Sequence, residues 1–104
     1  MNRLDQRIDN VYVVTRTGMV EKVVQVRTGE THDIPSLKGI HIAEAIHDPL
    51  VTNHVVNQIR RTLDTGWPTE VLFPVRLTDI IELRIATIEK MSTDRVLMFV
   101  HPAE

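Results

Sequence analysis

The stretch DPLVTNHVVNQIRRTLDTG, residues 48–66, decides the fold because it specifies one complete helix together with both of its ends. Asp48 suits the N-cap and Pro49 suits the first helical position, while Gly66 is a typical helix stop. Apolar residues recur every four positions along it: Val51, Val55, Ile59 and Leu63. This spacing predicts one apolar stripe that faces a core and an opposite side that faces solvent.

Strand patterns lie on both sides of this helix. Before it, β-branched runs at residues 11–14 and 20–26 are separated by a turn in which Gly18 suits a positive φ. After it, alternating patterns predict three further strands, over residues 70–77, 81–86 and 96–100. The Pro74 ring argues for an edge position or a bulge.

Three segments complete the chain. The polar residues 28–39 are expected to form a loop or single helical turns. A short helix that ends before Pro49 is indicated by Ile42, Ala45 and Ile46. A short amphipathic helix or cap is expected at residues 1–9, where Met1, Leu4 and Ile8 recur at helical spacing. The prediction is an α+β domain at residues 10–104, with a five-stranded antiparallel sheet and helices inserted between its second and third strands.

Composition excludes several functions. The chain has 104 residues and no Cys, so it has no thiolate nucleophile, iron–sulfur cluster or cysteine-based zinc site. The formal charge of −2, with 12 basic and 14 acidic residues, provides no basic field for nucleic acid. Apolar runs are strand-sized and no signal peptide is recognisable, so no membrane partner and a cytoplasmic location are expected.

Four segments carry a resemblance to a known family. They are DNVYVV at 9–14 followed by TG at 17–18, LKGIHIAE at 37–44, IRRTLDTGWP at 59–68, and DRVLMFVH at 94–101. In order and spacing the chain resembles a PAS domain, the small sensory module of many signalling proteins. The resemblance implies a PAS-like sheet and a sensory and protein-interaction role in signal transduction, with an output domain or partner protein and without catalysis. The Asp-Ile-Thr that commonly closes the family's domain is replaced here by residues 101–104.

Two ligand hypotheses follow. A pocket for a small apolar molecule would lie between helix and sheet, lined by Val55, Ile59, Leu83, Ile85, Val96 and Met98. Haem is the second possibility, because haem-binding members of the family place their proximal ligand on this long helix and His54 lies on it, although the helix phase puts His54 at the margin of the apolar stripe. With no Cys, a cysteinyl-flavin adduct and the covalent chromophore of the photoactive-yellow-protein branch are excluded. No cofactor is the first expectation, and the spacing of His41 and His47 does not favour a metal site.

The last interpretation concerns self-association. Both faces of the final predicted strand are apolar, which suggests a covering layer on each side. A homodimer interface is therefore predicted at Met1, Leu4, Ile8, Leu97 and Phe99. The alternative of a small α+β enzyme has no support in a nucleophile motif, and no catalytic residue is assigned.

Overall fold

The computed structural model describes residues 8–27, 30–33, 39–46, 48–77 and 80–103. Its six antiparallel strands form one sheet in the order β3-β2-β1-β6-β5-β4. The strands are β1 (Ile8–Thr15), β2 (Val20–Arg27), β3 (Glu30–Asp33), β4 (Thr69–Leu77), β5 (Ile80–Lys90) and β6 (Arg95–Pro102). Helices α1 (Ile42–Ile46) and α2 (Pro49–Thr65) follow β3 and precede β4 in the chain.

The predicted α+β class and the five predicted strands are confirmed, and two details differ. A sixth strand, β3, occupies part of the expected loop and pairs with the end of β2. Its sequence ETHD has no apolar alternation, so only backbone pairing reveals it. The first strand begins at Ile8, so the prediction of a helix over residues 1–9 is wrong for Ile8 and Asp9. The other residues of that helix lie outside the described part.

Helix α2 begins and ends where the sequence predicts. Asp48 Oδ1 accepts hydrogen bonds from the amides of Leu50, at 3.0 Å, and Val51, at 3.2 Å. These bonds satisfy two of the N–H groups that a helix start leaves free. At the other end Gly66 adopts a φ of +78° and its amide donates to the Thr62 carbonyl at 2.8 Å. Local chemistry therefore fixes both ends of the helix.

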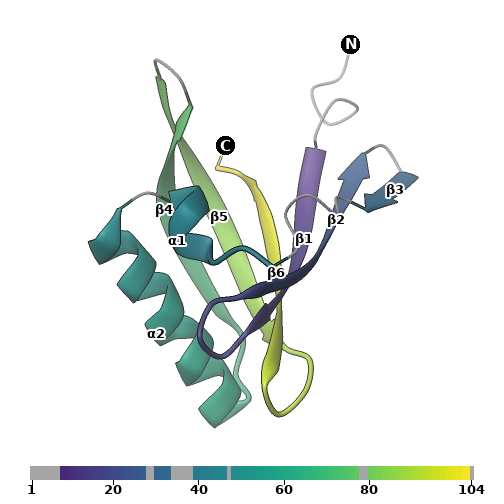
Figure 1. The fold of residues 1–104 in the computed structure, drawn as a ribbon, viewed down its shortest axis with the longest axis vertical. Coiled ribbons are helices and arrows are strands. Elements are labelled where there is room, and N and C mark those ends of the chain that lie inside the picture. The colour runs from purple at the N-terminus through teal and green to yellow at the C-terminus, as the bar shows by residue number, and fades with distance from the viewer. Residues whose placement is uncertain (1–7, 28–29, 34–38, 47, 78–79, 104) are drawn as a thin grey trace.

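The core lies between α2 and one face of the sheet (Figure 1). Its largest fully buried side chains are Val14, Val23, Val55, Ile59, Thr62, Ile88 and Val96. Thr62 is a polar member of this set, and its hydroxyl donates to Thr69 Oγ1 at 3.0 Å. That bond ties the end of α2 to the first residue of β4 across the intervening loop.

Strand β4 lies at one edge of the sheet, which fits the expectation for Pro74. Both described helices lie on the same side of the sheet in Figure 1. Neither of these helices has the length and apolar character that crossing a bilayer requires.

Substituting Asp48 tests the role of the helix cap. Asp48→Ala is expected to lower the free energy of unfolding by about 1 kcal/mol, because two amides lose their acceptor. Urea denaturation measures the change, and Asn57→Ala, at an exposed position within α2, is the control. An Asp48→Ala protein as stable as the Asn57→Ala protein would contradict the assigned cap.

Candidate functional site

The face of the sheet opposite α2 is the candidate site, and we call it the uncovered face because neither of the two described helices packs on it. Cross-strand partners share a face, and residues next to the buried ones in each strand point the other way. The apolar residues that the register assigns to this uncovered face are Val11, Val13, Val24, Leu72, Ile81, Leu83, Ile85, Leu97 and Phe99. Leu72, Ile81 and Leu83 are 58%, 65% and 49% exposed. These three residues lie on the adjacent strands β4 and β5, and a group of large exposed apolar side chains is typical of an interaction site.

The predicted interface residues lie partly on this face. Leu97 and Phe99 alternate with the buried Val96, Met98 and Val100 along β6, at the centre of the sheet. Of the other predicted residues, Met1 and Leu4 lie outside the described part of the chain, and Ile8 is the first residue of β1. The uncovered face therefore contains two of the five predicted positions.

The predicted ligand pocket is divided between the two faces of the sheet. Val55, Ile59, Val96 and Met98 are members of the buried core and are at most 4% exposed. The prediction is wrong for Leu83 and Ile85, which the register assigns to the uncovered face. The buried residues of β5 are Ala86 and Ile88. Both faces of this strand carry apolar residues, so alternation alone could not show which face is inside.

The predicted haem ligand and the predicted absence of a metal site concern histidine and acidic side chains. His54 is exposed on α2, away from the core side where Val55 and Ile59 are buried. Among the described residues, no three His, Asp or Glu side chains lie close enough together to hold a metal ion.

A polar group that the sequence did not indicate lies on the helix side of the sheet. The Asn10 amide donates to the Tyr12 hydroxyl at 3.4 Å, and both residues belong to β1. Burial raises the pKa of Tyr12, while the bond from Asn10 and the charge of Arg84 oppose the rise. Asn10 Oδ1 is buried and accepts no hydrogen bond within the described structure. Alternation along β1 places Asn10 and Tyr12 on one face, whereas the proximity of Arg84 depends on the register of β5.

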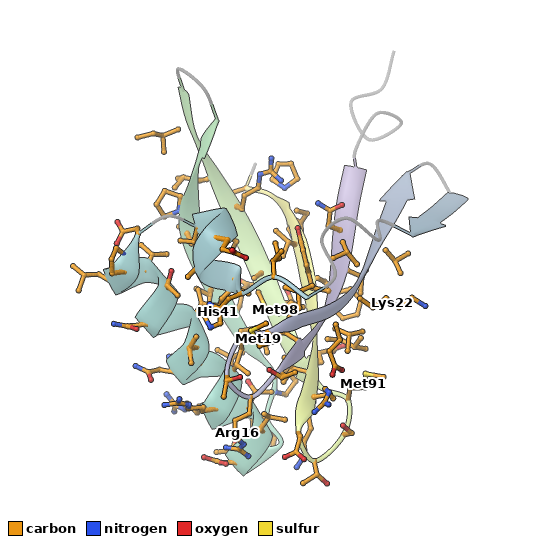
Figure 2. The ribbon with its side chains drawn as sticks, in the orientation of Figure 1. Arg16, Met19, Lys22, His41, Met91 and Met98 are labelled. Atoms are coloured by element: carbon orange, nitrogen blue, oxygen red, sulfur yellow. The ribbon has the colours of Figure 1, made fainter. Side chains whose placement is uncertain are left out.

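His41 joins the β1–β2 turn to the start of α1. Its Nδ1 accepts from the Ala43 amide at 3.0 Å, so the ring proton lies on Nε2 and is donated to the Thr17 carbonyl at 2.7 Å. Figure 2 shows the ring on the helix side of the sheet. A hollow of about 450 Å³ beside it is lined by His41, Ala43, Asp48, Pro49, Thr52 and Asn53. The Asp48 carboxylate already caps α2 there, which disfavours an anionic ligand.

No protein-family model matches this chain, and no curated protein matches it either.

The titration of Tyr12 tests its burial. A pKa above the ordinary 10.0 means that the neutral hydroxyl is favoured in the folded state. The resulting stability is complete below pH 10.0 and is lost as the pH rises through the folded-state pKa. The wild type is thus expected to lose stability more steeply above this pH than Tyr12→Phe.

Tyrosinate absorbance measures this titration directly, because Tyr12 is the only tyrosine in the chain. The folded protein should titrate at a higher pH than the urea-unfolded chain, which is the control. Identical titration curves for the folded and unfolded chains would contradict the burial of Tyr12.

Two glycine substitutions test the His41 contact. Gly18 and Gly66 both have positive φ, +96° and +78°, but only at Gly18 would an added Cβ meet His41 Nε2, at 2.8 Å. Gly66→Ala is expected to cost about 1 kcal/mol through backbone strain, and Gly18→Ala at least about 2 kcal/mol. Urea denaturation compares them, and equal losses of stability would contradict the close contact between turn and ring.

Proposed function

We propose that this chain is a PAS-like protein-interaction module that forms a homodimer through the uncovered face of its sheet and has no catalysis of its own. The observation that carries this proposal is the exposure of large apolar side chains on that face, at Leu72, Ile81 and Leu83. Water contact with this surface is unfavourable at about 25 cal/mol per Å². A second copy of the same face supplies the missing apolar layer.

The order of elements supports the PAS-like part of the proposal. Strands β1 and β2, the two helices, and strands β4, β5 and β6 follow one another in the order on which the sequence resemblance rests. In a signalling protein, such a module passes on a signal by changing the population of its dimer, which an output domain or partner protein then senses. The short β3 is an addition at the edge beside β2.

Introducing a charge at the centre of the uncovered face tests the dimer. Phe99→Glu is expected to raise the dimer dissociation constant at least about thirtyfold, because a central aromatic residue contributes about 2 kcal/mol or more to an interface. Sedimentation equilibrium of both proteins over a wide concentration range measures this change.

Leu50→Glu is the matched control, because Leu50 is 81% exposed but lies on α2, in the other layer of the fold. It is expected to leave the dissociation constant within about threefold of the wild-type value. Equal weakening by Phe99→Glu and Leu50→Glu would contradict an interface on the uncovered face.

A second candidate function, binding of a small molecule, is favoured by the polar group of Asn10 and Tyr12. A buried acceptor without a hydrogen bond is costly, and a ligand with a donor group would satisfy Asn10 Oδ1. The chemistry suggested by this group is polar, whereas the pocket predicted from sequence was apolar. Haem ligation by His54 has no comparable observation in its favour, because His54 is exposed.

Native mass spectrometry of freshly purified protein, compared with its denatured mass, tests this candidate. A ligand at Asn10 is expected to add mass to the native species, and Asn10→Leu should remove it because the acceptor is lost. Extra mass that persists in Asn10→Leu would place the ligand elsewhere. A Soret band lost in His54→Ala would instead indicate haem.

A further inference from the structure

One row of residues crosses the uncovered face with a charge at each end. The strand register aligns Lys22 of β2, Val13 of β1, Leu97 of β6 and Glu89 of β5. Lys22 and Glu89 are exposed, and Figure 2 shows Lys22 directed away from the helices. The row therefore has a basic end, two apolar residues in its centre and an acidic end.

The two end charges do not neutralise each other within one copy. Three strand spacings separate them, about 14 Å, which is too far for an ion pair. Neither residue forms an ion pair with any other residue in the described part of the chain. The neighbouring charges Arg95 and Glu21, by contrast, are paired with each other. Lys22 and Glu89 are thus available to an outside partner.

Resting on the proposed function, we propose that two copies pack sheet to sheet about a two-fold axis that runs parallel to the strands, between β1 and β6. Rotation by 180° about this axis places the row of one copy over the same row of the other copy, in the opposite order. Lys22 of one copy then faces Glu89 of the other, and Val13 faces Leu97, each contact occurring twice. In this arrangement basic residues meet acidic residues and apolar residues meet apolar residues, as an isologous interface requires.

The centre of the next row supports the same axis. The full row consists of Asp33, Val24, Val11, Phe99, Thr87 and Glu70, in order from β3 to β4. Reversal about the same line places Val11 against Phe99, so that apolar residues again meet at the centre, whereas the acidic positions 33 and 70 are brought opposite each other only at the two edges of the sheet. Two sheets packed in this way keep their strands nearly aligned, as face-to-face sheets commonly do.

Charge also disfavours the other simple arrangement. An axis perpendicular to the strands would keep each strand opposite its own copy. If such an axis passed through this row, Lys22 would face Lys22 and Glu89 would face Glu89, which is repulsive on both sides of the interface. The two axes therefore predict different responses to charge reversal.

Single and double charge reversals distinguish them. Lys22→Glu and Glu89→Lys should each raise the dimer dissociation constant about tenfold or more, because each creates two like-charge contacts. The double variant, Lys22→Glu with Glu89→Lys, should return to within about threefold of the wild type, because both pairs are restored. Sedimentation equilibrium at low salt measures all four proteins, and Arg61→Glu on the exposed side of α2 is the control.

Each other outcome overturns a specific claim. Single variants that dimerise like the wild type, or losses that add in the double variant, would overturn this axis while the interface itself stands. A wild type that is monomeric throughout would overturn the dimer and the axis together. Circular dichroism of each variant separates lost dimerisation from lost folding.

Discussion

The packing of α2 against one face of the sheet is the interaction on which the rest of the structure depends. Val55 and Ile59 of this helix are fully buried against the core strands. The short α1 adds Ile42 and Ile46 to the same core. A sheet has two faces, however, and both described helices lie on one of them. Within the described residues no helix covers the apolar residues of the other face, and this asymmetry is the origin of the proposed function.

Hydrogen bonds at the ends of the helices fix the position of the helical layer on the sheet. Lys90 of β5 donates to the Leu63 carbonyl at 3.0 Å, a favourable place for a cation at the end of α2. Arg16 in the β1–β2 turn pairs with Asp64 at 3.0 Å, although the two side chains are 39% and 63% exposed and the pair therefore adds little stability. His41 fixes the same turn to α1. The helical layer is thus anchored to both halves of the sheet, and neither described helix lies on the opposite face.

The sequence predicted the parts of this fold that local chemistry determines. Asp48, Pro49 and Gly66 act within one turn of α2, so its ends could be predicted without knowledge of the tertiary structure. The inward face of β5 could not, because Leu83 and Ile85 are as apolar as the buried Ala86 and Ile88. Strand β3 was missed since its polar residues show no pattern. Burial of Thr62 depends on its partner Thr69, which lies in another element.

The candidate surface could be predicted only in part, because a sequence pattern shows the faces of one strand but not how that strand aligns with its neighbours. Alternation along one strand was enough to assign Leu97 and Phe99 to the outward face of β6. Rows that cross several strands require the register of each pair, and no single strand contains that information. The complementary ends of the row, Lys22 and Glu89, therefore became visible only in the assembled sheet.

The central claim, that the uncovered face of the sheet is covered by a second copy, is tested most directly by sedimentation equilibrium of the wild-type chain. The account predicts a species of twice the 11.9 kDa chain mass that dissociates on dilution. It also predicts weaker association as salt screens the end charges of the row. A single species of 11.9 kDa at every concentration would contradict it.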